Sequence, residues 1–313
     1  MVPEPEIRCP WTFEDLCLWT YCLVDDLWER IAPQCRRPGP APVCSDPELV
    51  TMSLIGECKG WDRETVLVSE WAQHRDLFPH QPERTRFNRR RRQLQGAINE
   101  LRRLLLGVLD LAQDRQVVLD SLPVPVVNFH LVPRGHARAR WQAAGAAFGK
   151  VASKKITIFG FRLYLLVTLN GLILDFVLAP ANLPELQVGA ELLEEHTDLT
   201  AFSDKAWVSA PLVERLKEEN RLWLWTVPRR NEQRTVPDEV KAHLHTVRQV
   251  IETVNSQLTE QFHLETNHAQ GFWGLTARLH TKLTAHTLCV HLNRLRGSAH
   301  PLRIKHLAFP PPI

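Results

Sequence analysis

The stretch ITIFGFRLYLLVTLNGLILDFVL, residues 156–178, contains two apolar runs that meet at Asn170-Gly171. The runs, Ile156–Leu169 and Leu172–Leu178, hold many of the β-branched and aromatic residues that strands favour. Asn-Gly between two such runs is the strongest short-range signal of a β-hairpin, because both residues tolerate the positive φ angles of a tight turn. The sequence therefore predicts an antiparallel pair of strands in the middle of the chain.

Shorter apolar runs on either side of this hairpin predict further strands, and longer segments between them predict helices. Buried strands of α/β proteins are apolar runs of this length. The predicted class is α/β, with a mixed sheet flanked by helices. Its other elements are strands at Val117–Asp120, Val124–Val127, Leu199–Ser203 and Leu222–Val227, a connection at Arg134–Lys155 expected to be mobile, and helices at Leu183–His196, Ser209–Asn220 and Glu239–Leu295, the last broken near Gly271 and Gly274.

The first 112 residues are expected to be helical. The spacing of apolar residues predicts a helix over Thr12–Ile31, which Pro33 is expected to end. Ser45 and Glu48 have the spacing of a capping box, in which each side chain accepts a hydrogen bond from the other residue's backbone N–H. The helix that they begin and another over Asp62–His74 resemble a helix-turn-helix.

A long basic helix is expected from Glu83 to Leu111. The chain has a net charge of only +3, but the segment Arg84–Arg103 holds eight arginines against one acid, Glu100. Such a cluster attracts a polyanion, and arginine suits phosphate contact because its guanidinium binds phosphate through two hydrogen bonds. The alternative is a solvated helix face. The residues expected to contact DNA here are Arg89, Arg90, Arg91 and Arg92.

Composition indicates a globular protein of the cytosol. The chain is 44% hydrophobic and 23% charged, the balance of a soluble domain. No apolar run approaches the length of a membrane span, and the N-terminus has no apolar signal segment. Six of the seven cysteines lie in the first 58 residues without a CxxC pair, which favours buried thiols over a zinc site.

Two aspartates follow apolar runs of the predicted sheet. Asp120 comes after Val117–Leu119, and Asp204 comes after Leu199–Ser203. Residues at the carboxyl ends of strands in open α/β sheets face the ligand crevice. Two carboxylates placed together there repel each other unless a cation neutralises them, and Mg²⁺ prefers such hard oxygen ligands. Each aspartate alone remains ambiguous, because strand ends often carry acids.

Glu252 is a third candidate acid, on an expected helix, and two interpretations are open for it. Arg248 lies one turn before it, so the pair could be an ordinary surface ion pair, which the residues alone favour. The other interpretation is an acid that faces Asp120 and Asp204. Glu252 lies away from the apolar positions of that helix, which are Val247, Val250, Ile251, Val254 and Leu258.

Six motifs, in order, resemble those of bacterial insertion-sequence transposases with a DDE triad and an RNase H-like fold. Asp120–Pro125 resembles the first-aspartate motif, Phe202–Trp207 the second, and Arg248–Glu252 the Arg-x-x-x-Glu motif of the third acid. Ser203 and Ala206 depart from the usual glycines but leave the triad intact. The similarity spans about Asp76 to Arg296 and is greatest to insertion-sequence group 982. The other three motifs are Phe159–Leu166, Val177–Asn182 and Arg229–Asn231.

This resemblance implies a helical DNA-binding region over residues 1–112, an RNase H-like catalytic domain over 113–296 and a C-terminal tail over 297–313. It implies that Asp120, Asp204 and Glu252 bind two Mg²⁺ or Mn²⁺ ions, with which the enzyme cuts transposon ends and transfers the freed strands to target DNA. The residues implied to hold DNA phosphates or to orient the carboxylates are Lys205, Arg229, Arg230 and Arg248.

The partners implied are the inverted-repeat ends of a transposon and a target DNA, with no membrane involved. Two ends imply a homodimer on DNA, in the cytoplasm and at the nucleoid. Two rival functions are a plain RNase H-like nuclease and an inactive descendant that only binds DNA. Trp207, beside Asp204, is expected either in the core or stacked on a displaced base.

Overall fold

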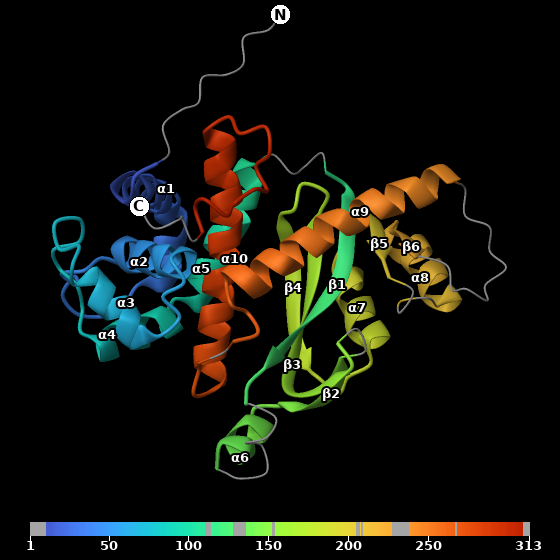
Figure 1. Cartoon of the computed structure of the whole chain (residues 1–313), viewed down its shortest axis with the longest axis horizontal. Coiled ribbons are helices and arrows are strands. Elements are labelled where there is room, and N and C mark those ends of the chain that lie inside the picture. Colours follow the sequence, from blue (N-terminus) through green and yellow to red (C-terminus); the bar gives the residue numbers. More distant parts are fainter. Residues whose placement is uncertain are drawn as a thin grey trace, which may run out of the picture.

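A single mixed sheet forms the centre of the computed structural model, which describes residues 11–109, 114–127, 136–151, 154–204, 207, 209–226, 238–266 and 268–308 (Figure 1). Helices cover both faces of the sheet, and a helical region precedes it. The predicted class, α/β with an RNase H-like mixed sheet, is confirmed. The strands are β1 Gln116–Pro125, β2 Ala147–Val151, β3 Ile156–Thr168, β4 Ile173–Pro180, β5 Thr200–Ser203 and β6 Trp223–Thr226.

The predicted hairpin is present as β3 and β4, which pair antiparallel on either side of Asn170-Gly171. Gly171 has a φ of +78°, the left-handed conformation that glycine adopts without a steric penalty. β1 pairs antiparallel with the other edge of β3, and β5 and β6 continue from β1 in parallel. The sheet therefore changes from antiparallel to parallel at β1.

The alternation of side chains along β1 divides the core into two layers. Val117 and Leu119 pack with α7 (Glu185–Glu194) and α8 (Ala210–Asn220) on one face. Val118 and Leu122 belong to the core on the other face, which α9 crosses in Figure 1. The helices of that second face are α9 (Asp238–Ser256), extended by a π-helical turn at Gln257–Gln261, and α10 (Phe272–Leu295).

The helical region begins each of its first two helices with a capping box. The box predicted at Ser45 is present: the Ser45 amide donates to Glu48 at 2.6 Å, and the Glu48 amide donates to the Ser45 hydroxyl at 3.3 Å. Thr12 and Asp15 form the same arrangement. The helices are α1 Phe13–Cys35, α2 Asp46–Cys58, α3 Glu64–Trp71, α4 Arg84–Gln93 and α5 Gln95–Val108.

Local expectations were wrong at several boundaries. Pro33 lies inside α1, which ends only at Cys35, because a proline in a last turn removes few helical hydrogen bonds. The expected basic helix is two helices, since the chain bends at the buried Leu94. The segment expected to be a mobile connection contains α6 (His136–Ala143) and β2. β2 forms there because the start of β3 extends beyond β4 and offers it a pairing edge.

The expected regions do not have separate cores, because α10 packs against α2 and α5. Lys282 of α10 donates to the buried Glu57 of α2 at 2.6 Å, and the sulfur atoms of Cys58 and Cys289 lie 3.5 Å apart. Ile304, in the expected C-terminal tail, is buried in the same core. The helical region and the sheet are therefore joined through α10.

The described cysteines lie in the helical region, except for Cys289 on α10. Cys17, Cys58 and Cys289 are buried, whereas Cys22 is exposed. In the described part of the chain, no three His, Cys, Asp or Glu side chains are arranged to hold one metal ion. Within the same residues, no helix is long and apolar enough to cross a membrane.

Trp207 is a core residue, so the alternative in which it stacks on a displaced base is wrong. Its ring is only 2% exposed and meets the Tyr164 ring edge-on at 5.9 Å. Gly189 of α7 makes room for the ring, since a Cβ atom at this position would lie 1.7 Å from a Trp207 ring carbon. The tryptophan thus packs against α7.

Gly189→Ala is expected to lower the free energy of unfolding by about 1–3 kcal/mol, because the added methyl group overpacks the Trp207 site. Gly96→Ala is the matched control: Gly96 is also helical, but its Cβ would meet nothing within 4 Å. That change should raise stability by about 0.5–1 kcal/mol, the ordinary helix preference for alanine. Urea denaturation measures both. Equal effects of the two changes would contradict the packing described for Trp207.

Candidate active site

The register of β1 and β5 brings Asp120 and Asp204 to the same level of the sheet. The last pair of the parallel ladder is Leu119 with Ser203, so the next residues along the two strands are these aspartates. β5 ends there, whereas β1 continues beside β3 to Pro125. Asp120 therefore lies within a strand rather than at its end, and the ending of β5 exposes it to the crevice.

Both aspartates are directed to the face of the sheet that α9 covers. Side chains alternate along a strand, and Val118 and Phe202, two positions before the aspartates, pack in the core with Val247 and Ile251 of α9. The intervening Leu119 packs on the opposite face with α7 and α8. Because every second side chain of a strand points to the same face, Asp120 and Asp204 point to the face that α9 covers.

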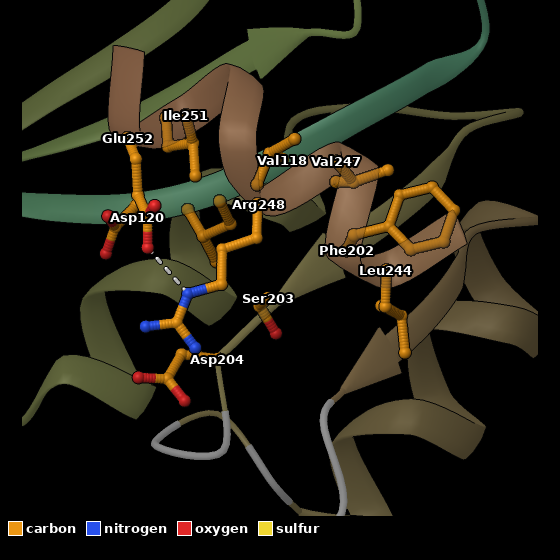
Figure 2. A pocket seen from close by; sticks show the side chains of 11 residues that line it. Val118, Asp120, Phe202, Ser203, Asp204, Leu244, Val247, Arg248, Ile251 and Glu252 are labelled. Atoms are coloured by element: carbon orange, nitrogen blue, oxygen red, sulfur yellow. Dashed lines mark hydrogen bonds and ion pairs between the residues drawn. The ribbon is translucent and has the colours of Figure 1, made fainter. Parts of the chain in front are cut away.

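Helix α9 brings Glu252 to the same place. Val247, Ile251 and Val254 are buried against the sheet, and Glu252 lies on the exposed side of the helix beside Arg248. Figure 2 shows the acids and Arg248 around one pocket of about 90 Å³, the volume of a few water molecules. The lining residues are Val118, Leu119, Asp120, Phe202, Ser203, Asp204, Leu244, Val247, Arg248, Ile251 and Glu252.

The charge of Asp120 is destabilised by its surroundings. Burial raises the pKa of this carboxyl above its ordinary value, and the nearby Asp204 raises it further. Three contacts oppose the rise in pKa: the Ser121 amide at 2.8 Å, the Asn255 side-chain amide at 2.7 Å, and the charge of Arg248. Because burial prevails, the ionised carboxylate gains from any cation that enters the pocket.

Among the described residues, Arg248 is the cation that faces the carboxylates. Its Nε donates to Glu252 Oε1 at 2.7 Å, and Figure 2 shows its guanidinium between Glu252 and Asp204. The hydrogen bond to Glu252 raises the pKa of Arg248, and the charges of Glu252, Asp204 and Asp120 add to the rise. The i,i+4 ion pair of the alternative interpretation therefore exists, but it stands at the mouth of the acidic pocket.

Asn255 is a residue of this site that the sequence did not single out. It lies one turn after Glu252 on α9, and its Nδ2 donates to Asp120 Oδ2. Its own Oδ1 is buried and has no hydrogen-bond partner among the described residues. The spacing of three from Glu252, which places both residues on one side of a helix, was the available signal.

The donor set fits a divalent metal. Carboxylate oxygens are the ligands that Mg²⁺ and Mn²⁺ prefer, and Asp120, Asp204 and Glu252 all line the pocket. The raised pKa of Asp120 and the unpartnered Oδ1 of Asn255 mark a place where a hydrated cation would be stabilised. Glu252 is turned to Arg248, so it has to leave that partner before three carboxylates can share an ion.

The run Arg89–Arg92 divides into two pairs. Arg90 binds Asp46 at 2.7 Å and the Cys35 carbonyl at 3.0 Å, and Arg91, 2% exposed, binds Glu64 at 2.6 Å. These two arginines stabilise the helical region, which corrects their expected role in DNA contact. Arg89 and Arg92 are exposed, and for these two arginines the contact with DNA stays a prediction. Three other expected DNA contacts, Lys205, Arg229 and Arg230, lie outside the described residues.

Comparison with known proteins gives one family. The family model described as "Transposase DDE domain" matches residues 114–270, about half of the chain. The matched range runs from β1 to the segment before α10 and includes Asp120, Asp204 and Glu252. No curated protein and no solved structure matches the chain.

Proposed function

Because the chain belongs to the transposase DDE domain family, we propose that it cuts DNA at the ends of a transposon and joins them to a target. The observation that carries this proposal is the convergence of Asp120, Asp204 and Glu252, from β1, β5 and α9, on one pocket. Three carboxylates brought together from positions 84 and 48 residues apart repel one another unless cations lie between them, and Arg248 brings one positive charge to the three.

Asp120, Asp204 and Glu252 would hold Mg²⁺ or Mn²⁺. A pair of such ions stabilises the attacking and leaving oxygens of an in-line displacement at phosphorus. Asp120 lies on β1 and Asp204 directly follows the neighbouring strand β5, so they supply ligands that need little rearrangement. Glu252 is the ligand that has to move. Its exposed side chain must give up the hydrogen bond from Arg248 before it can bind the metal ion.

Two displacements follow from this assignment. In the first, water attacks the phosphorus at a transposon end, and the bond to the 3′ oxygen breaks to leave a 3′-hydroxyl. In the second, that hydroxyl attacks a target phosphodiester, a new P–O bond forms, and the target's own 3′ oxygen leaves. Neither step needs a covalent bond to the enzyme. Arg248, once Glu252 has turned away, can neutralise a DNA phosphate near the pocket, a role also proposed for Lys205, Arg229 and Arg230.

The finer assignments are part of the same proposal. The motifs from Asp120 to Glu252 support insertion-sequence group 982. Residues 1–112 serve mainly in DNA binding and residues 113–296 in catalysis, although α10 joins the two regions. A homodimer in the cytoplasm, associated with the nucleoid when it is bound to DNA, would hold two transposon ends.

The test is an assay on labelled DNA that carries the inverted repeats flanking the gene. The full-length protein with Mg²⁺ is expected to release a 3′-hydroxyl end and to form a longer joined product, and EDTA should abolish both. Cleavage without joining would indicate a plain nuclease instead. DNA binding with neither product would indicate an inactive descendant.

A further inference from the structure

A larger hollow lies outside the candidate active site, between α3, α4 and the start of α10. Its volume is about 630 Å³, several times that of the acidic pocket, and it is open to solvent. Figure 1 shows α3 and α4 in the helical region, on the same side of the sheet as α10. The lining residues used below are Arg63, Arg84, Arg92, Gly271 and Trp273.

The hollow is electropositive, because three of the four arginines that line it are exposed and its acids are already paired. Arg63, Arg84 and Arg92 are exposed and form no ion pair with any described residue. Of the two acids that line the hollow, Asp62 binds Lys282 at 3.1 Å and Glu64 binds the buried Arg91. Three exposed guanidinium groups are therefore available to a polyanion.

The first turn of α10 adds a second source of positive potential. This helix of 24 residues begins after Gly271, and no side chain in the described part of the chain caps it. The first amides of a helix have no partner within the helix, and its dipole favours an anion there. In this structure the uncapped end opens into the same hollow as the arginines, so both sources act on one ligand.

Trp273 gives the hollow an aromatic surface. Trp273 is 65% exposed, which is unusual for a residue with a large apolar side chain. Its neighbour Phe272 packs against Phe161 of the sheet, with 5.6 Å between the ring centres, and so anchors the backbone from which Trp273 projects. A fixed backbone with an exposed indole suits stacking on a nucleic-acid base.

We infer that this hollow binds a single strand of DNA, with phosphates on Arg63, Arg84 and Arg92 and one base stacked on Trp273. Arginines alone would suit any polyanion, but an exposed indole adds affinity only for a ligand with flat faces. A duplex conceals those faces within its base stack, so the ligand is an unpaired strand. The choice of DNA rests on the proposed function, which requires strand ends to be held near the enzyme.

The experiment measures binding of a labelled oligo-dT of about 15 nucleotides to the full-length protein in EDTA, by fluorescence anisotropy at several salt concentrations. Trp273→Ala is expected to weaken binding about tenfold. Arg84→Ala/Arg92→Ala should weaken it and lower the slope of log K against log salt by about 1.4, which is about 0.7 for each phosphate that is no longer neutralised.

Matched controls come from the same region and the same residue types. Arg75→Ala/Arg86→Ala removes two exposed arginines of the helical region that do not line the hollow. Trp223→Ala removes another half-exposed tryptophan, on β6. Both controls should bind the oligomer almost as the unchanged protein does. Thermal melting of each variant verifies that it is folded, as expected for exposed positions.

The inference is overturned if Trp273→Ala binds oligo-dT as tightly as Trp223→Ala does. It is also overturned if the two double arginine variants have the same affinity and the same salt dependence, or if poly-glutamate of equal charge competes as well as unlabelled oligo-dT. Its failure is distinguishable from failure of the proposed function, because binding is measured without metal and strand joining with metal. If the protein joins strands normally but the Trp273 and arginine variants bind oligo-dT as the unchanged protein does, only the inference about the hollow is rejected. If these variants bind oligo-dT more weakly but the protein cleaves no DNA, only the proposed catalytic function is rejected.

Discussion

Asp120→Asn is expected to reduce Mg²⁺-dependent cleavage at least about a hundredfold while making the metal-free protein more stable. Cleavage is lost because an amide cannot supply the negative charge that holds the cation. Stability rises because the change removes a buried charge that lies near Asp204. The Ser121 amide still finds an oxygen acceptor, and Asn255, whose Oδ1 has no partner, can rotate its amide to accept from the new Nδ2.

The pH dependence of this gain in stability has a defined sign. Since burial raises the pKa of Asp120 in the folded protein, its carboxyl favours folding at low pH, and that contribution is lost as pH rises through the folded pKa. The gain in stability of Asp120→Asn over the unchanged protein should therefore grow with increasing pH. Thermal melts in EDTA between about pH 4 and 8 measure it.

Asp175 is the matched control on the same sheet. Burial raises the pKa of this half-buried carboxyl, but hydrogen bonds from His196 and the Phe176 amide outweigh burial and lower the pKa below its ordinary value. The ionised Asp175 carboxylate thus stabilises the folded protein at pH values above the pKa that this carboxyl has in the unfolded chain. The stabilisation is lost as the pH falls through the lower pKa that it has in the folded protein. Asp175→Asn should destabilise the protein at neutral pH. If Asp120→Asn and Asp175→Asn both raised or both lowered the stability at neutral pH, the environments described for the two carboxyls would be contradicted.

Mg²⁺ provides a readout of the site that does not depend on DNA. A ligand that binds only the folded state raises its stability, so added Mg²⁺ should raise the melting temperature of the unchanged protein. Asp120→Asn should show a much smaller rise. A variant that kept both the full rise and the cleavage activity would show that Asp120 is not a metal ligand.

Trp207→Ala should lower the free energy of unfolding by about 3–5 kcal/mol, the usual result of removing a large buried aromatic side chain. The Trp207 ring fills the space between Gly189 and Tyr164. Its amide also donates to the Asp204 carbonyl at 3.1 Å, so the cavity should loosen the second aspartate and weaken the stabilisation by Mg²⁺. Urea denaturation with and without Mg²⁺ measures both effects.

Two variants keep this prediction interpretable if Trp207→Ala folds poorly. Trp207→Phe retains an aromatic ring and should lose less stability, with a measurable transition. Trp223→Ala removes a ring that is 48% exposed and should cost far less than the buried one. A loss for Trp207→Ala no larger than that for Trp223→Ala would argue against the role of Trp207 as a core residue beside the site.

Features encoded by neighbouring residues could be predicted from the sequence. The hairpin at Asn170-Gly171 and the capping box of Ser45 and Glu48 depend on contacts a few residues apart, and both are present. The apolar positions of α9 likewise placed Glu252 on the exposed side of its helix. Motif resemblance, rather than any residue alone, connected Asp120, Asp204 and Glu252.

Features that depend on distant segments were decided only by the tertiary structure. The parallel register of β1 and β5 places Asp120 beside Asp204, and no local pattern fixes that register. Arg90 and Arg91 looked like any surface arginines until their partners on α2 and α3 were known. The burial of one tryptophan and the exposure of another follow from what packs on them. Such contacts join residues far apart in the chain, so the energies that decide them are absent from any short window of sequence.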